Sequence, residues 1–256
     1  MATTETSLHP IRIDPARDAR TLGREFKSAR RMQIRDFLAA EDAEWTWDQL
    51  AHHTPWGMVY NVGNRVEELS NAQLRQLAGP QLRDLAAGVV DRAKTQYQFM
   101  YYLYPLTTEY FNTPSTLPIL RFYEFLNRAE TLEYFRTLTG RDDIKWAHAQ
   151  ATLYAPGHFL KSHSDLEPHN NRRAVAFVFN FTKLWERDWG GYLQFFNQQH
   201  DVELAWRPLF NALNIFAVPH DHSVELVSPF AGALRLAITG WLRTDDPPGP
   251  FGRLAG

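Results

Sequence analysis

The fold of this chain is decided around the stretch Tyr154-Ala-Pro-Gly-His-Phe-Leu-Lys-Ser-His163-Ser-Asp165, which places a histidine and an aspartate two positions apart. Side chains two positions apart on a β-strand leave from the same face, so a strand here would direct both toward one site. A chain with 10 histidines produces an isolated His-x-Asp by chance fairly often. The meaning of the tripeptide therefore depends on the segments that accompany it.

Two later segments supply the partners that such a site needs. His222-Ser-Val-Glu-Leu-Val offers a second imidazole, and Arg235-Leu-Ala-Ile-Thr-Gly-Trp-Leu begins 13 positions after it. Two imidazoles and one carboxylate form the facial triad of non-haem Fe(II) sites, which leaves three positions of an octahedral ion open. We therefore predict that His163, Asp165 and His222 are both the metal ligands and the catalytic residues. His220 is a rival for the third position, because it shares a strand face with His222.

The order of these pieces along the chain adds to their weight. A tyrosine and a glycine precede His-x-Asp, Gly190-Gly191 opens a Gly-Gly-x-Leu-x-Phe segment, and His-x-Val and Arg-x-Ala-Ile-Thr-x-Trp follow. This ordered set resembles the 2-oxoglutarate- and Fe(II)-dependent dioxygenases, specifically their prolyl 4-hydroxylase-like branch. The His-x-Val piece matches His222, so the resemblance favours His222 as the distal ligand and leaves His220 beside the ligands or at the entrance.

The resemblance implies that Arg235 anchors the far carboxylate of 2-oxoglutarate and that Tyr154 adds a hydroxyl hydrogen bond. A guanidinium binds a carboxylate with two parallel hydrogen bonds, which a lysine cannot do. Arg235 stands between Leu234 and Leu236, which is not typical of a solvated face, and a buried guanidinium needs a partner. A core acid is the alternative partner, and Tyr154 is equally compatible with a plain core tyrosine. Thr239 shares a strand face with Arg235 and is a further cosubstrate candidate.

The resemblance also implies the cofactors Fe(II), 2-oxoglutarate as cosubstrate and O₂, with ascorbate as an optional addition. Family members that halogenate lack the acid of the triad, so Asp165 points to hydroxylation or desaturation with release of succinate and CO₂. The implied substrate is a prolyl residue of a protein or peptide, and a free amino acid or other small molecule is the alternative. Two other interpretations stay open: a non-catalytic jelly-roll binding protein, and a cupin-like enzyme that has no need of Arg235.

The segment Trp185-Glu-Arg-Asp-Trp-Gly-Gly precedes the strand expected to carry Phe195. One interpretation is a tight turn in which the glycines adopt positive φ. The other is that Trp185, Arg187 and Trp189 form part of the mouth through which substrate enters, because loops at barrel ends often carry specificity.

Other polar and aromatic residues near these segments are interpreted as structural. Arg172 and Arg173 are expected to begin a strand in solvent, although they lie near enough to the site to matter for an acidic substrate. The aromatic run 97–104 is expected to be core rather than a substrate-binding surface. Three further histidines are expected on the surface or in loops: His158, His169 and His200.

Composition bounds the class of protein. The hydrophobic fraction of 44% and charged fraction of 22% are ordinary for a globular chain of 256 residues. A net charge of −2 gives no electrostatic basis for a nucleic-acid partner or an anionic membrane, and the absence of cysteine excludes disulfides and thiolate metal sites. The N-terminus lacks an apolar signal segment and no run approaches the roughly 18 apolar residues of a membrane span, so cytoplasm is the expected compartment. The sequence does not predict the oligomeric state.

The chain is expected to fold as α+β, with a double-stranded β-helix (jelly roll) core and N-terminal helices packed against one sheet. Helix boundaries are predicted at Ser70, as an N-cap, and at Gly140, as the residue after a helix. The expected regions are a loosely ordered leader (1–30), a helical support region (31–144), the catalytic core (145–243) and a tail (244–256), with 31–243 forming one compact domain. Eight short strand-like runs indicate the jelly roll: 146–154, 158–165, 173–181, 191–196, 202–206, 213–218, 222–227 and 233–243.

Overall fold

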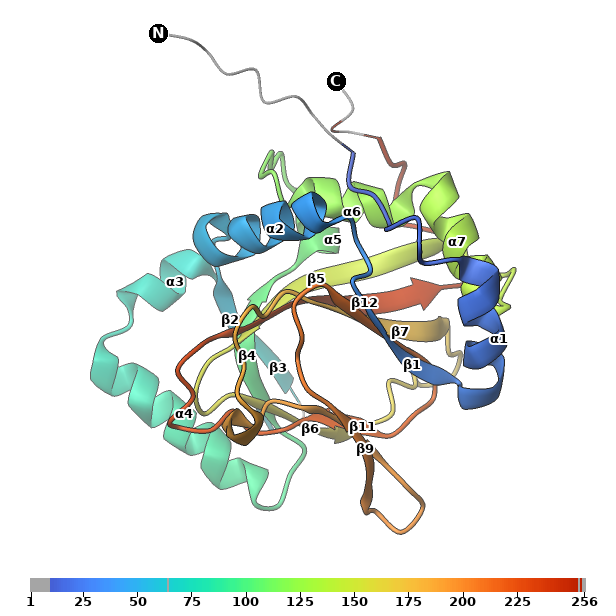
Figure 1. Ribbon diagram of the computed structural model, residues 1–256. Helices are drawn as coiled ribbons and strands as arrows, with labels where there is room; N and C mark the ends of the chain where they lie inside the picture. Colours follow the sequence, from blue (N-terminus) through green and yellow to red (C-terminus); the bar gives the residue numbers. More distant parts are fainter. Residues whose placement is uncertain (1–9, 64, 253, 255–256) are drawn as a thin grey trace, which may run out of the picture.

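The computed structural model describes residues 10–63, 65–252 and 254. Its antiparallel strands curl into a nearly closed barrel with helices on the outside (Figure 1). The strands are β1 (Arg31–Arg35), β2 (Gly57–Val62), β3 (Arg65–Leu69), β4 (Phe99–Tyr104), β5 (Trp146–Tyr154), β6 (Phe159–His163), β7 (Arg173–Asn180), β8 (Leu193–Phe196), β9 (Val202–Trp206), β10 (Ala212–Ala217), β11 (His222–Val224) and β12 (Arg235–Arg243). The helices are α1 (Ala19–Ala29), α2 (Ala40–Asp48), α3 (Asn71–Gln76), α4 (Gly79–Ala93), α5 (Leu106–Asn112), α6 (Leu120–Asn127) and α7 (Ala129–Thr139), with a π-helical turn η1 (Gln49–His53) and a 3₁₀ turn η2 (Arg187–Trp189).

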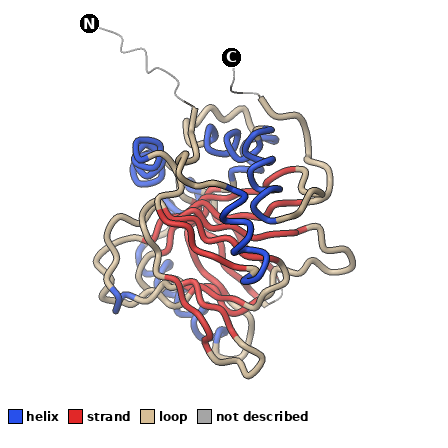
Figure 2. Tube along the Cα trace, turned by 45° about the vertical axis from the view of Figure 1, so that its right-hand side comes forward, coloured by secondary structure: helices blue, strands red, loops and turns tan. Residues whose placement is uncertain are grey.

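The strands form one path in the order β1-β10-β7-β12-β5-β4-β6-β11-β8-β9, with β2 and β3 attached beside β4. The path bends at β4, which pairs with β5 and with β6, so that the two halves of the barrel face each other (Figures 1 and 2). This arrangement confirms the predicted jelly-roll core. Strands β5 to β12 match the eight predicted runs to within three residues at each end.

The central strand β12 shows why such sequences form a sheet with two different faces. Leu236, Ile238 and Leu242 belong to the main hydrophobic core that includes residues of the outer helices. The alternate residues Arg235 and Thr239 line the interior of the barrel. A shift of one residue in pairing would turn every outward leucine inward, so the alternation specifies the register of β12 against β5 and β7.

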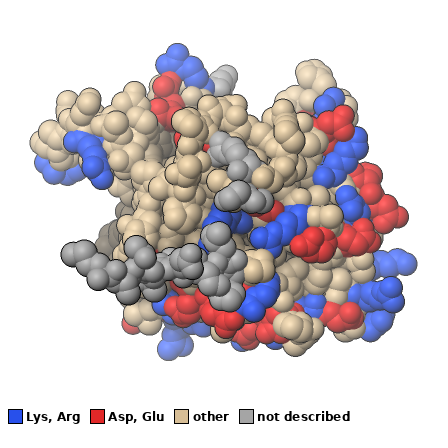
Figure 3. Space-filling view, turned by 90° about the horizontal axis from the view of Figure 1, so that it is seen from above, with Lys and Arg blue, Asp and Glu red and all other residues tan. Residues whose placement is uncertain are grey.

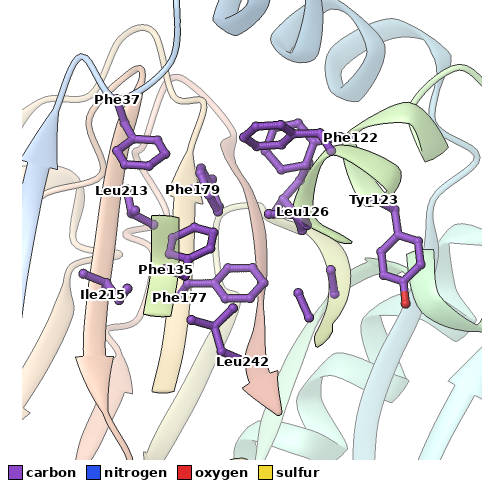
Figure 4. Close-up of a cluster of buried hydrophobic side chains, with 14 of the residues drawn as sticks. Phe37, Phe122, Tyr123, Leu126, Phe135, Phe177, Phe179, Leu213, Ile215 and Leu242 are labelled. Carbon is purple, nitrogen blue, oxygen red and sulfur yellow. The ribbon is translucent and has the colours of Figure 1, made fainter. Parts of the chain in front are cut away.

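Helices α6 and α7 cover the outer face of β7 and β10. Phe122 and Phe135 from these helices meet Phe179 of β7 and Ile215 of β10 in the main core (Figure 4). The rings of Phe122 and Phe179 lie edge to face with centroids 5.2 Å apart. Burying one such side chain contributes about 1.5–3 kcal/mol, so this layer is a main source of stability for the wall behind the site.

Two helix boundaries agree with the predictions. Ser70 caps α3, because its hydroxyl accepts a hydrogen bond from the N–H of Gln73 while the Gln73 side chain accepts one from the N–H of Ser70. Gly140 follows α7 with a left-handed φ of 67°, and its N–H donates to the carbonyl of Arg136. Both boundaries follow from local chemistry that a short window of sequence contains.

The region 31–144, expected as a helical support, contains helices α2 to α7 and also contributes strands β1 to β4. Both β1 and β4 lie on the path of the barrel sheet. The helical pattern that starts at Ser70 ends in α4 at Ala93, and the aromatic run continues as β4. Aromatic residues favour extended structure, and pairing with β5 and β6 outweighs the helical spacing that precedes them.

The predicted leader differs from its expectation where it is described. Residues 1–9 lie outside the described part of the chain. From residue 10 onward the segment packs on the molecule: α1 is capped by Asp18, and Phe26 is buried in the main core. The polar composition conceals this, because one buried aromatic is enough to attach an amphipathic helix.

The outer surface carries charge of both signs. Figure 3 shows basic and acidic side chains interspersed on the face seen from above, in keeping with a net charge of −2. Within the described ranges, the helices are too short or too polar to cross a membrane.

Candidate metal centre

Strands β6 and β11 bring the predicted ligands together. His163 ends β6, His222 begins β11, and the two residues are partners across the antiparallel ladder. Asp165 follows two positions after His163 in the left-handed conformation, with φ of 63°. One ligand atom from each residue lies within 4.8 Å of the others, so the three side chains are placed to hold a single ion.

Backbone carbonyls set the orientation of both imidazole rings. Nδ1 of His163 lies 3.0 Å from the carbonyl oxygen of Lys161, and Nδ1 of His222 lies 2.7 Å from that of His220. A carbonyl only accepts, so each ring carries its proton on Nδ1 and presents the Nε2 lone pair. The Nε2 atoms lie 3.3 and 3.5 Å from the two carboxylate oxygens of Asp165. Acceptors that converge in this way are stabilised by a cation, and the donor set fits Fe(II).

Local electrostatics keep two of the ligands in their metal-binding forms. Burial and the neighbouring His163 lower the pKa of His222 to about 4, so this imidazole is neutral at pH 7. Burial alone would raise the pKa of Asp165, but its contacts with the two imidazoles lower that pKa to about 2. A neutral imidazole and an ionised carboxylate are the forms that coordinate a metal.

His220, the rival for the third position, points away from this cluster. Its Nε2 atom accepts a hydrogen bond of 2.6 Å from the Arg31 guanidinium, and its ring packs on Phe195 with centroids 5.1 Å apart. Its backbone carbonyl, rather than its ring, meets the His222 imidazole. The structure therefore brings His222, and not His220, to the other two predicted ligands.

The three predicted ligands line a cavity of about 400 Å³ inside the barrel. Tyr97 and Val66 also line it and are 42% and 53% exposed, so the cavity reaches the surface beside them. Arg235 lines its buried part. The cavity thus connects solvent with the cluster and with the predicted anchor of the cosubstrate.

Arg235 heads the largest fully buried side chains of the described chain. It is 1% exposed, and its Nε and Nη1 atoms have no hydrogen-bond partner among the described residues. Its guanidinium lies 5.0 Å from the ring centre of Tyr154, and burial lowers its pKa. The alternative of a core acid gains no support, because no ion pair of the described residues includes Arg235. An unpaired buried charge is costly, and a carboxylate ligand would offset that cost.

Tyr154 and Thr239 share the cavity with Arg235. Tyr154 is the partner of Arg235 in the ladder between β5 and β12, and its ring stacks on Tyr101 with centroids 5.0 Å apart. Burial raises the pKa of Tyr154 well above its ordinary value, so its hydroxyl keeps the proton that it would donate. Thr239 lines the cavity four positions further along β12. All three predicted cosubstrate residues are within one cavity, and their roles stay predictions.

Arg173 lines the same cavity, contrary to the expectation of a strand that begins in solvent. Its Nη1 atom lies 3.4 Å from the carbonyl oxygen of Asp165 and 4.0 Å from its carboxylate. The guanidinium lies 3.9 Å from the ring centre of Trp241. Arg173 does begin strand β7, but pairing opposite Arg243 of β12 turns its side chain toward the cluster. That long-range pairing leaves no local signal in the sequence.

The prediction that the aromatic run is core is confirmed for most of its residues, but one face of the run also lines the cavity. Met100 and Tyr104 pack into hydrophobic clusters on the other face. Phe99 and Tyr101 are buried in a further hydrophobic cluster and line the cavity together with Tyr97. The alternation of these positions is the signal that could have found them, because a strand with period two presents two different faces.

The predicted substrate mouth lies apart from this cavity. Trp185 and Trp189 are buried against each other with centroids 5.5 Å apart, and Arg187 lies on the surface. None of the three lines the cavity around the cluster. The tight-turn interpretation is supported, since Gly190 has φ of 64° and a Cβ there would lie 2.2 Å from the carbonyl oxygen of Leu226. A substrate contact by the three residues stays a prediction.

Of the three histidines expected on the surface or in loops, one lies in a loop and is buried. His158 is 5% exposed and packs on Tyr102 with ring centroids 4.8 Å apart, whereas His169 and His200 are exposed as predicted. Two backbone hydrogen bonds of 2.9 Å hold this loop to Val227: the N–H of Gly157 donates to the carbonyl of Val227, and the N–H of Val227 donates to the carbonyl of His158. Burial lowers the pKa of His158 to about 4.

Comparison with known families matches residues 149–243 to the model of the 2OG-Fe(II) oxygenase superfamily. The matched segment contains His163, Asp165, His222 and Arg235. Comparison with the sequences of curated proteins gives no significant match.

Solved structures share the fold at low sequence identity. A 2OG-Fe(II) oxygenase family oxidoreductase from Burkholderia pseudomallei has a TM-score of 0.59 and 12% identity, with 90% of this chain and 92% of that chain covered. A prolyl hydroxylase from Trichoplax adhaerens, in complex with a peptide fragment of the hypoxia inducible factor oxygen degradation domain, has a TM-score of 0.54 and 14% identity, with 88% and 89% covered. The non-heme alpha-ketoglutarate-dependent epimerase SnoN from nogalamycin biosynthesis has a TM-score of 0.51 and 11% identity, with 93% and 92% covered.

At these identities the solved structures support the fold, and the matched segment supports the family. The family match and the jelly-roll barrel point to the same cavity, because the matched residues include every strand from β6 to β12. The resemblance found in the sequence is therefore confirmed over residues 149–243, which match the model of the 2OG-Fe(II) oxygenase superfamily; this match and the cluster of His163, Asp165 and His222 support an oxygenase whose cofactors are Fe(II), 2-oxoglutarate and O₂.

Proposed function

We propose that this oxygenase is a hydroxylase of an unactivated C–H bond, and that its substrate is a prolyl residue of a protein or peptide. The observation that carries the proposal is a single cavity that holds both the cluster of His163, Asp165 and His222 and the unpaired guanidinium of Arg235. A metal site alone would not require such an arginine. A purely structural arginine would have an acid beside it.

The residues of the cavity divide the work among them. His163, Asp165 and His222 would hold Fe(II) on one face and leave the remaining positions open toward the cavity. Arg235 would orient 2-oxoglutarate by its far carboxylate, with the Tyr154 hydroxyl as a further donor. When bound, Fe(II) and 2-oxoglutarate supply the oxidising chemistry, with succinate and CO₂ as products. A substrate that fills the open side of the cavity would, together with the buried walls, exclude water from the reacting centre.

The outer part of the cavity suits a cyclic apolar group. Tyr97, Phe99 and Tyr101 form an aromatic wall, and the ring of Tyr97 lies 5.9 Å from that of His163. Such a wall matches the pyrrolidine ring of a prolyl residue. The Trichoplax structure with the same fold holds a peptide, which supports a peptide substrate by analogy.

Arg173 favours a second candidate, a free amino acid or another small molecule with a carboxylate. The nearest acid besides Asp165 is Glu167, whose carboxylate already accepts from Arg243 at 2.9 Å and from the backbone N–H of Arg172 at 2.9 Å. The Arg173 guanidinium lies 3.4 Å or more from both acids. It therefore keeps donors for a carboxylate near the metal, which a free amino acid has and a mid-chain prolyl residue lacks.

Succinate release tests the proposal. The chain is incubated with Fe(II), O₂ and 2-oxoglutarate, together with proline-containing peptides or with free amino acids, and products are examined for one added oxygen atom. A peptide substrate is expected to stimulate succinate release and to become hydroxylated. If neither class raises succinate above the uncoupled rate, the substrate proposal is wrong; if His163→Ala or Asp165→Ala keeps turnover, the assignment of the metal ligands is wrong.

Two variants separate the candidates. Arg173→Gln is expected to weaken the binding of a carboxylate substrate about 10- to 150-fold, because one charge-assisted hydrogen bond is lost. The binding of a peptide substrate should weaken less. Arg235→Ala is expected to raise the concentration of 2-oxoglutarate needed for half-maximal turnover. A cupin-like enzyme that does not use this cosubstrate would show no kinetic change. A non-catalytic binding protein would bind metal and 2-oxoglutarate and release no succinate.

A further inference from the structure

The two ends of the sheet path, β1 and β9, meet without a backbone ladder between them in the described chain. Arg31, the first residue of β1, spans this gap, which we name the seam. Its Nη2 atom lies 2.6 Å from Oε2 of Glu203 on β9, and its side chain is 14% exposed. The seam is thus closed by side chains rather than by strand pairing.

The same guanidinium reaches the loop that precedes the third predicted ligand. Nη1 of Arg31 lies 2.6 Å from Nε2 of His220, and since arginine only donates, His220 accepts. The backbone carbonyl of His220 in turn accepts the hydrogen bond of 2.7 Å from Nδ1–H of His222. His220 therefore links the N-terminal strand to the group that orients the His222 imidazole.

A second route runs through two phenylalanines. The Arg31 guanidinium lies 5.2 Å from the ring centre of Phe195, and that ring lies 5.1 Å from His220 and 6.3 Å from His222. Phe216 packs on His222 with centroids 4.7 Å apart and on His220 at 6.5 Å. The His220 ring thus contacts both rings that hold His222 in place.

Strand β11 is short, with three residues of which His222 is the first. It pairs regularly with β8, where His222 lies opposite Phe195, but its pairing with β6 is irregular between His222 and Val224. The loop before it is held at its two ends by backbone hydrogen bonds of 3.2 Å, from Val218 N–H to the carbonyl of Ala174 and from Phe196 N–H to that of Asp221. Between these ends, the His220 side chain is held by its hydrogen bond with Arg31 and by packing on Phe195 and Phe216, and the hydrogen bond is the polar contact that fixes its orientation.

We propose that Arg31, acting through His220, is a positioning residue for the ligand His222, so that β1 is a functional part of the metal centre. The proposal rests on the proposed function in that His222 binds the metal. Without the contact between Arg31 and His220, the loop moves and the His222 imidazole no longer points steadily at the site that it shares with His163 and Asp165. Metal binding weakens more than the fold does.

The test is a titration of the metal-free full chain with Co(II). Binding is measured by calorimetry and by the visible absorption of bound Co(II). His220→Phe keeps a ring against Phe195 but removes the acceptor for Arg31, whereas His220→Gln keeps an acceptor. His220→Phe and Arg31→Ala are expected to weaken Co(II) binding about 10- to 100-fold, as the loss of an outer partner of a metal ligand does, and to change the absorption spectrum. His220→Gln is expected to retain affinity near that of the wild type.

Glu203→Gln is the matched control, because it removes the ion pair of the seam and leaves the contact between Arg31 and His220 in place. An ion pair to a half-exposed glutamate contributes little, so this variant should bind Co(II) like the wild type. The inference is overturned if the wild type binds Co(II) and His220→Phe binds it equally, with an unchanged spectrum. If the wild type binds no Co(II), or His222→Ala binds it as well as the wild type does, the proposed function fails instead. Should Arg31→Ala not fold, the two His220 variants still decide.

Discussion

At the scale of single residues, Arg235 is placed where its charge does not help the protein to fold. The side chain is 1% exposed, and two of its nitrogen atoms have no partner in the described chain. Burial lowers its pKa, which is a direct sign that the environment disfavours the charge. A group of this kind is kept for a ligand, so binding and stability should respond in opposite directions when it is replaced.

We predict that Arg235→Met raises the melting temperature of the free protein and abolishes its stabilisation by 2-oxoglutarate. Methionine fills much of the same space without a charge, and replacing buried charged groups by apolar ones often stabilises a protein by about 1–4 kcal/mol. The measurement is thermal unfolding of metal-loaded protein with and without 2-oxoglutarate. Arg187→Met, on the surface, should change neither quantity. Retained stabilisation by 2-oxoglutarate in Arg235→Met would contradict the assigned anchor.

At the scale of elements, β12 carries most of the constraints on the site. It pairs along its length with both β5 and β7 and presents Arg235, Thr239 and Trp241 to the cavity. Its one glycine, Gly240, allows β5 to approach closely, because a Cβ there would lie 1.8 Å from the carbonyl oxygen of His148. Only a residue without a side chain fits this position.

Gly240→Ala is therefore expected to destabilise the fold by more than about 3 kcal/mol or to prevent folding, since backbone must move to admit the methyl group. The comparison variant is Gly63→Ala, in the turn between β2 and β3. A Cβ there has nothing within 4 Å and meets only the strain of a φ of 62°, which costs about 1–2 kcal/mol. Urea unfolding of both variants gives the two differences in free energy. If both variants lost the same free energy of unfolding, β5 and β12 would be able to move apart at Gly240 without a loss of stability.

The elements also show what the sequence could predict. The strands of the core were predictable because each is a short alternating or apolar run between turns. His163 and Asp165 were predictable as a pair, but the expected strand face was not the reason: β6 ends at His163, and Asp165 reaches the cluster from a left-handed turn after the strand. The inward turn of Arg173 was not predictable, because it depends on the register of β7 against β12. Strand β4 was hidden in the same way, since its residues read equally as core until its pairing with β5 and β6 exposes one face to the cavity.

At the scale of the whole molecule, segments far apart in the chain combine into one site. The first residue of β1 lies 189 positions before the histidine that it contacts, and residues of β4 line the same cavity as residues of β7 and β12. Periodicity describes a segment and its immediate neighbours, so it could not reveal that the N-terminal region supplies both a barrel edge and a cavity wall. For the same reason the cluster was predictable as a set of residue types, while the residues around it were not.

The molecule as a whole should be sensitive to acid through buried histidines outside the ligand set. Burial, with the nearby charges of Arg243 and Arg173, lowers the pKa of His148 to about 4, and burial lowers that of His158 to about 4. An unfolded histidine has a pKa of about 6.5, so between pH 6.5 and 4 the unfolded chain binds protons that the folded chain does not. Stability is therefore complete above pH 6.5 and falls as the pH decreases, by about 1.4 kcal/mol per pH unit for each histidine.

The prediction is checked by urea unfolding of the metal-free chain between pH 7.5 and 5. The wild type should lose about 3 kcal/mol per pH unit from these two residues below pH 6. His158→Phe keeps an aromatic ring beside Tyr102 and removes one titrating group, so its free energy of unfolding should fall less steeply than that of the wild type, by about 1.4 kcal/mol per pH unit. A control substitution of the exposed His169, which lies outside these buried surroundings, should leave the slope unchanged. Equal slopes for the wild type and His158→Phe would mean that His158 can take up a proton inside the folded protein, and that the loop carrying it opens more readily than its buried position and paired backbone indicate.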